Sequence, residues 1–231
     1  MLPAAPNPHR EIVVATASDL APAQADLASS FHQLTGIDAK FVTGASGMLA
    51  RQIASGAPYD VFLSANKLYV DDLVRSGDLL ADSVVIYARG RIGLWSPGGT
   101  VKQLDGLRRA EVKHIAIANP RHAPYGVAAR QALERAGLWN AVKDRIVYGE
   151  NVRQALQYAE SGNADAVITS WSLLEGRGVL LPESLHDPIR QAGGILSRSN
   201  RRQEARAFLR FLMSPRGMEV LGRFGLQPER K

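Results

Sequence analysis

A turn of small residues lies in the stretch VTGASGMLARQ, residues 42–52, between an expected strand and an expected helix. The backbone N–H groups of a first helical turn have no partner within the helix, and the positive end of the helix dipole lies beside them. With a hydroxyl such as that of Ser46 nearby, this arrangement can bind an anion. The stretch lacks the Gly-Lys-Ser/Thr ending of a P-loop, so it does not predict a nucleotide site.

Three further segments lead from an expected strand into an expected helix: TASDL at 16–20, NPRHAPYG at 119–126 and GENVR at 149–153. Together the four segments offer the hydroxyls of Ser18 and Ser46 and backbone N–H groups near Tyr125 and Val152. Ligands of open α/β sheets bind outside the carboxyl ends of the strands. We therefore expect the four segments to converge on one compact oxyanion, held by hydrogen bonds and helix dipoles.

Each of these segments also has a purely structural interpretation. We interpret Asp19 as a helix cap, and Ser46 is as compatible with capping as with anion binding. His122 is interpreted as a surface group, and Arg153 as an outer electrostatic partner rather than a direct ligand. It is the recurrence of four similar segments that favours an anion site.

Sequence motifs of catalysis are missing. The chain has neither a G-x-S-x-G nor an H-E-x-x-H motif, and its five histidines show no metal-ligand spacing. The absence of cysteine excludes disulfides, thiolate catalysis and zinc–cysteine sites. A serine nucleophile would need a base, and His122 is the candidate among these segments. We predict a binding protein without a cofactor, and keep an enzyme acting on a phosphate ester or anhydride as the alternative from another class.

The composition limits the possible partners. With 45% hydrophobic and 22% charged residues, the 231-residue chain can bury a substantial core, yet it has no apolar run of membrane-spanning length. The formal charge is +6, but the basic residues are scattered and do not alternate with aromatic residues, so we predict no nucleic-acid binding. Residues 1–10 hold three prolines and no apolar signal region, which predicts a flexible tail.

Short β-rich runs alternate with helical patterns, which predicts an α/β fold with mainly parallel sheets flanked by helices. Predicted strands are 11–16, 39–43, 60–64, 114–118, 145–148 and 164–169, and predicted helices begin near 20, 48, 67, 127, 151, 201 and 215. The pattern restarts near residue 114, so two lobes are expected, with crossovers at 84–95 and 189–196. We assign residues 11–88 and 195–231 to lobe 1 and residues 89–194 to lobe 2, with the ligand cleft between them.

The sequence resembles the periplasmic molybdate-binding proteins of ABC importers over nearly its whole length from Glu11. The resemblance rests on four motifs together: VVATASDL, GASGMLARQIASGAPYDVFLSAN, IAIANPRHAPYGVAARQALERAGLW and ENVRQALQYAESGNAD. It implies a periplasmic-binding-protein fold in which two α/β lobes, joined by two crossover strands, close on molybdate or tungstate. Members of the family bind the oxyanion with serine hydroxyls and main-chain N–H groups, without a positive side chain in contact.

The resemblance also implies individual site residues. Its two serine positions correspond to Ser18 and Ser46, and its later main-chain donors correspond to Tyr125 and Val152. Further N–H groups are expected from the neighbours of the serines, Ala17 and Gly47. Many members place a tyrosine after the strand ADAVIT, where this chain has Thr169, a shorter side chain that departs from the pattern.

The same resemblance implies a cellular role. It implies an exported, periplasmic monomer, trimmed of a signal peptide, that delivers its ligand to an ABC importer permease in the membrane.

Sulfate, phosphate or another tetrahedral oxyanion is the alternative ligand, and a carboxylate of Asp19 pointing into the cleft would favour phosphate. The effector domain of a transcriptional regulator would need a helix-turn-helix, for which the N-terminal segment has no room.

Overall fold

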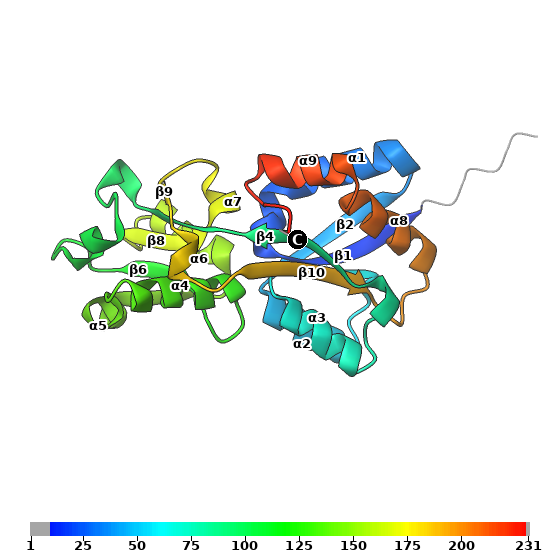
Figure 1. The fold of residues 1–231 in the computed structure, drawn as a ribbon, viewed down its shortest axis with the longest axis horizontal. Coiled ribbons are helices and arrows are strands. Elements are labelled where there is room, and N and C mark those ends of the chain that lie inside the picture. The colour runs from blue at the N-terminus through cyan, green and yellow to red at the C-terminus, as the bar shows by residue number, and fades with distance from the viewer. Residues whose placement is uncertain (1–9, 230–231) are drawn as a thin grey trace, which may run out of the picture.

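Two five-stranded sheets lie beside each other in the computed structural model, each flanked by helices (Figure 1). The structure describes residues 10–229. The tail predicted at 1–10 therefore lies outside the described residues except for Arg10, whose guanidinium pairs with the Glu204 carboxylate at 2.9 Å. Across the described range, none of the helices combines the length and the apolar character that crossing a membrane requires.

The first sheet has the order β2–β1–β3–β10–β4. Its strands are β1 (Glu11–Ala17), β2 (Asp38–Gly44), β3 (Val61–Ser64), β4 (Val85–Gly90) and β10 (Ile189–Ile195). β1 pairs in parallel with β2 and β3, while β10 runs antiparallel between β3 and β4. All four residues of β3 are buried, as expected for a central strand covered by helices on both faces.

Helices cover both faces of this sheet. The helices are α1 (Gln24–Thr35), α2 (Ser46–Ala54), α3 (Lys67–Arg75), α8 (Arg202–Leu212) and α9 (Pro215–Arg223), with the 3-10 helices η1 (Ser18–Ala23) and η2 (Ala81–Ser83). α1, α8 and α9 share one core, while α2 and α3 pack on the opposite face (Figure 1). Within the first core, the rings of Phe31 and Phe208 meet edge to face with centroids 5.2 Å apart. That geometry is a favoured one for aromatic pairs.

The second sheet has the order β7–β6–β8–β5–β9. Its strands are β5 (Ile92–Trp95), β6 (Ile115–Ala118), β7 (Ile146–Gly149), β8 (Ala166–Ser170) and β9 (Val179–Leu180). Its helices are α4 (Pro124–Arg135), α5 (Trp139–Val142), α6 (Val152–Glu160) and α7 (Trp171–Leu174), with 3-10 helices at η3 (Pro97–Gly99), η4 (Leu104–Arg108), η5 (Lys143–Arg145) and η6 (Glu183–Leu185). Here β5 is the antiparallel strand, paired with β8 and β9.

The chain crosses between the sheets twice. It leaves the first sheet at the end of β4 and enters the second at β5, after one intervening residue, and it returns through β10 (Figure 1). The predicted lobe division stays a prediction. The pairing of β10 with β3 and β4 favours moving its second boundary, because residues 189–194 hydrogen-bond within the first sheet.

Two helices begin earlier than the pattern predicts. α2 starts at Ser46 instead of Met48, and α4 starts at Pro124 instead of Val127. Proline suits the first helical position, because its fixed φ matches the helix and its missing N–H would have no helical partner. The earlier starts place Ser46 and Tyr125 in first helical turns. The predicted helix beginning near Leu20 is instead the 3-10 helix η1 followed by α1.

Candidate functional site

A small cavity with about 200 Å³ of empty space lies between the two lobes. Residues 17–19, 44–46 and Ala65 line it from the first lobe, and residues 123–125 and 151–152 line it from the second. The first three segments follow β1, β2 and β3, and the other two lead into α4 and α6. Strand ends and helix starts of both sheets therefore meet at one point, which suits an anionic ligand.

Of the six residues assigned to the oxyanion, five line this cavity: Ala17, Ser18, Ser46, Tyr125 and Val152. Gly47 does not line it. The backbone N–H of Gly47 donates instead to the carbonyl of His122 across the lobes, with 2.9 Å between N and O. A Cβ built on Gly47 would lie 2.7 Å from the Tyr69 hydroxyl, so glycine is needed here for close packing.

Ser46 is buried at the start of α2, and its hydroxyl oxygen accepts a hydrogen bond from the Ala65 N–H at 3.0 Å. The residue before the helix is Ala45, and within the described chain no side chain caps α2. The structure therefore does not show the Ser46 hydroxyl capping the helix. Because its oxygen accepts one bond, the hydroxyl hydrogen is left to donate to a ligand.

Ser18 is also buried, and its hydroxyl has no hydrogen-bond partner among residues 10–229. A buried polar group without a partner costs about 1–3 kcal/mol, so such groups are rare in folded proteins. An oxyanion in the adjoining cavity would supply the missing acceptor.

Backbone donors come from the second lobe. Val152 is the first residue of α6, whose N-cap is Asn151. The Asn151 side chain accepts from the N–H groups of Arg153 and Gln154 at 2.9 and 3.1 Å. The Val152 N–H lies outside this cap, and as a first-turn group it has no partner within the helix.

Thr169 does not line the cavity. Its buried hydroxyl donates to the Val152 carbonyl at 3.0 Å. The short side chain therefore ties the end of β8 to the start of α6. In this arrangement Thr169 positions Val152, and its hydrogen is not available to a ligand.

The interpretation of Asp19 as a helix cap is wrong. η1 begins at Ser18 after Ala17, and no side chain in the described range caps it. Asp19 Oδ2 instead accepts hydrogen bonds from the Tyr125 hydroxyl at 2.8 Å and from the Gln191 amide at 2.5 Å. Burial raises the pKa of the Asp19 carboxyl to about 6, although the hydrogen bonds from Tyr125 and Gln191 lower it. The sequence pattern gave no signal for this cluster, because its members lie 106 and 172 residues from Asp19.

Cationic side chains stay outside the cavity. Among residues 10–229, Asp19 is the one charged residue that lines it. Arg121 and Arg153 are exposed, and the His122 ring lies 2.9 Å from the Glu150 carbonyl through Nε2. The same range holds no cluster of three His, Asp or Glu side chains that could bind a metal ion. The chemistry available is hydrogen bonding to an oxyanion from neutral donors.

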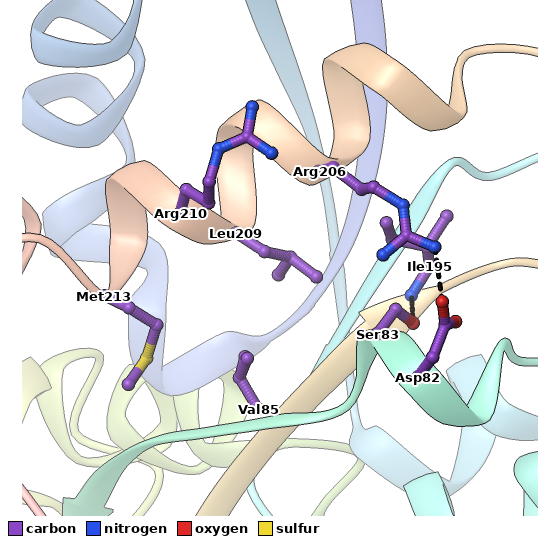
Figure 2. Close-up of a pocket in the computed structure, with 8 residues that line it drawn as sticks. All are labelled: Asp82, Ser83, Val85, Ile195, Arg206, Leu209, Arg210 and Met213. Atoms are coloured by element: carbon purple, nitrogen blue, oxygen red, sulfur yellow. Dashed lines mark hydrogen bonds and ion pairs between the residues drawn. The ribbon is translucent and has the colours of Figure 1, made fainter.

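A larger groove, with about 690 Å³ of empty space, lies on the first lobe beside α8 (Figure 2). Arg206 and Arg210 lie on α8 at its rim, Leu209 points from α8 into the groove, and Val85 of β4 and Ile195 of β10 line it from the sheet. Arg206 pairs with the Asp82 carboxylate at 2.7 Å. None of the residues assigned to the oxyanion lines this groove.

Comparison with known proteins gives consistent results. A model of the bacterial extracellular solute-binding proteins matches residues 12–227. The molybdate-binding protein ModA of Azotobacter vinelandii is 36% identical over 224 residues, covering 93% of this chain and 89% of that protein. ModA of Rhodobacter capsulatus is 30% identical over 233 residues, covering 99% and 91%. The solved structure of the periplasmic molybdate-binding protein of Azotobacter vinelandii matches with a TM-score of 0.90 at 30% identity, covering 95% of this chain and 100% of that one.

These likenesses confirm the predicted two-lobed fold of mainly parallel sheets. They also agree with the prediction that the chain is not an enzyme, because the matching proteins are binding proteins. The chain belongs to the bacterial extracellular solute-binding proteins, in the family of the molybdate-binding protein ModA.

Proposed function

We propose that this protein captures molybdate or tungstate in the cavity between its lobes and delivers it to an ABC importer permease from the periplasm. The observation that carries the proposal is the cavity itself, lined by the Ser18 and Ser46 hydroxyls and by first turns of α4 and α6, with no cation among its described lining residues. The names of the relatives in Azotobacter vinelandii and Rhodobacter capsulatus support the choice of ligand.

The donor set suits a fully deprotonated oxyanion. Molybdate and tungstate at neutral pH present four acceptor oxygens and no proton, so a site made of donors can satisfy them. In this proposal Ser18, Ser46 and Val152 supply donors on both sides of the cleft, and Ala17 and Tyr125, which also line it, are expected to add backbone N–H groups. Neutral donors aimed into a closed site bind an anion without the desolvation that a buried cation would require.

One observation favours a second candidate ligand. Asp19 Oδ1 is buried and has no hydrogen-bond partner among the described residues, although Oδ2 has two. A protonated oxyanion such as hydrogen phosphate could donate its proton to this oxygen, whereas molybdate could not. Phosphate is therefore the competitor that the test must include.

Calorimetric titration and thermal unfolding with molybdate, tungstate, sulfate and phosphate separate these candidates. A ligand at about 100 times its dissociation constant stabilises the fold by about 2.7 kcal/mol. We expect this stabilisation at low concentrations of molybdate or tungstate, and much less with equal sulfate or phosphate. A stabilisation by phosphate equal to or larger than that by molybdate would overturn the assignment.

A further inference from the structure

Three buried polar side chains from separate parts of the chain meet next to the cavity. Asp19 comes from η1 in the first lobe, Tyr125 from the first turn of α4 in the second lobe, and Gln191 from the crossover strand β10. Each is at most 2% exposed. The Gln191 amide nitrogen lies 2.5 Å from Asp19 Oδ2 and 2.8 Å from the Tyr125 oxygen, which is itself 2.8 Å from Asp19 Oδ2.

Ser170 of β8 also hydrogen-bonds to Tyr125 from within the second lobe, and the hydrogens that join Tyr125 to Asp19 and Gln191 follow from the chemistry of the three side chains. An ionised carboxylate can only accept, so the Tyr125 hydroxyl and the Gln191 amide both donate to Asp19. The second amide hydrogen of Gln191 donates to the Tyr125 oxygen. The opposite amide orientation would set two acceptors, Gln191 Oε1 and the carboxylate, against each other. The cluster is therefore a triangle of three hydrogen bonds, two of them to a charged group.

The surroundings are shaped to admit Tyr125 from the opposite lobe. A Cβ built on Gly90, at the end of β4, would lie 2.2 Å from the Tyr125 hydroxyl oxygen. No side chain larger than glycine therefore fits there while Tyr125 reaches Asp19. The backbone of Asp19 joins the second lobe as well, because its carbonyl accepts from the Ser172 hydroxyl at 2.6 Å.

These contacts depend on how far the lobes are closed. Asp19 lies in the first lobe and Gln191 hydrogen-bonds within the first sheet, so an opening of the lobes leaves those two together. Tyr125 belongs to the second lobe and moves away from both. The bonds made by the Tyr125 hydroxyl thus exist in the closed arrangement and are lost on opening.

We propose that Asp19, Tyr125 and Gln191 form an inter-lobe latch that holds the lobes closed over a bound oxyanion and so sets how slowly the ligand leaves. This inference rests on the proposed function. Hydrogen bonds that form only after the ligand has entered stabilise the closed complex. They do not stabilise the first contact between ligand and open protein, so their loss changes the dissociation rate and not the association rate. The two bonds lost by opening include one to a charged carboxylate, a class stronger than neutral pairs. We expect their loss to accelerate release by about tenfold to a hundredfold.

The test is Tyr125→Phe, which removes the hydroxyl but keeps the ring and the backbone N–H expected to contact the ligand. The matched control is Tyr87→Phe. Tyr87 is also buried and lies near enough to Asp19 and Tyr125 to interact with them electrostatically, but its hydroxyl donates to the Ser64 carbonyl, at 3.5 Å and within the first lobe. Association and dissociation rates for molybdate are measured by stopped-flow fluorescence. Trp171 is a suitable reporter, because this second-lobe residue approaches Gly225 of the first lobe so closely that a Cβ there would lie 2.7 Å from its ring.

The expected result for Tyr125→Phe is a dissociation rate raised about ten- to a hundredfold, with an association rate within about threefold of the wild type and with Tyr87→Phe close to the wild type in both. A dissociation rate within threefold of the wild type overturns the latch, and so does a loss that falls on association alone. If Tyr125→Phe does not fold, judged by circular dichroism, Asp19→Asn is measured against the same limits. Failure of the wild type to bind molybdate would instead refute the proposed function.

Discussion

The cavity between the lobes and the groove beside α8 differ in both size and charge. The cavity has about 200 Å³ of empty space, counting the part open to solvent, and its lining includes alanines, two serines, Tyr125, Asn151 and the buried Asp19 carboxylate. The groove has about 690 Å³ of empty space, counting the part open to solvent, and carries two arginines and Asp82 around an apolar floor (Figure 2). By volume and positive charge, the groove would be the natural choice for an anion.

The two regions also differ in how far their hydrogen-bond donors are buried. The hydroxyls of Ser18 and Ser46 are already removed from water, so a bound oxyanion replaces no hydration on the protein side. Arg206 is 41% exposed and is paired with Asp82, and its interaction with an anion would be weakened by solvent and salt. Under the proposed function, selective binding of a small oxyanion would rest on buried neutral donors, with little contribution from surface cations.

The largest expected effect comes from removing both hydroxyls of the cavity. A hydrogen bond to a charged acceptor contributes about 1.5–3 kcal/mol, so Ser18→Ala combined with Ser46→Ala should weaken molybdate binding about 100-fold to 10,000-fold. Each single variant should lose about ten- to a hundredfold. Calorimetric titration measures all three variants. Wild-type affinity in the double variant would remove both serines from the site.

The second prediction concerns Asp19, whose carboxyl group lies in the cavity wall. The pKa of Asp19 is raised in the folded state to about 6 from 3.8. The folded state therefore binds the proton more tightly than the unfolded chain. The resulting stability is fully present below about pH 4 and is lost as the pH rises through 6, a change of at most about 3 kcal/mol.

Asp19→Asn cannot titrate and serves as the reference for this prediction. Denaturant unfolding of the ligand-free proteins from pH 4 to pH 7 should show wild type losing stability relative to the variant as the pH rises. Taking the difference between the two proteins cancels other groups, such as His186, whose pKa is lowered mainly by burial. Parallel pH profiles would contradict a raised pKa for Asp19.

Local features of the sequence were sufficient for most of the fold. Helical spacing in residues 201–213 predicted the buried face of α8, and Ala205, Phe208, Leu209 and Leu212 are all at most 4% exposed. The strand-to-helix segments predicted which loops would reach the cavity. Each of these signals lies within about a dozen residues of chain, where hydrophobic periodicity and turn chemistry operate.

Contacts between distant segments could not be predicted in this way. The hydrogen bond from Tyr125 to Asp19 spans 106 residues, and that from Gln191 spans 172. A local pattern assigned Asp19 to a helix start, since an acidic residue beside a serine is typical of caps. In the folded protein, hydrogen bonds from Tyr125 and Gln191 fix the Asp19 carboxylate, so the local preference for helix capping does not decide its position. The position of β10 between β3 and β4 likewise depends on contacts between segments far apart in the chain, so local patterns could not predict it.

The third prediction separates the two serines by their effect on stability without ligand. Ser46→Ala removes the acceptor of the Ala65 N–H and should destabilise the fold by about 1 kcal/mol, the usual contribution of one hydrogen bond. Ser18→Ala removes a hydroxyl that has no partner among the described residues, so stability should stay unchanged or rise. Denaturant midpoints of the two variants measure this difference. Equal losses would mean that Ser18 is bonded in the ligand-free protein.

The smallest expected effect lies in the groove. Arg206→Ala and Arg210→Ala each remove a charge from α8, on a surface that none of the site residues lines. Charges separated by more than about 8 Å of salt solution at physiological ionic strength are largely screened, so molybdate affinity should change by less than about twofold, or about 0.4 kcal/mol. Titration at low and at physiological salt tests this directly. A long-range electrostatic effect of the arginines on molybdate affinity would appear at low salt and vanish at physiological salt. A tenfold loss that persists at physiological salt would show that the arginines contact the anion, and the groove would then replace the inter-lobe cavity as the binding site.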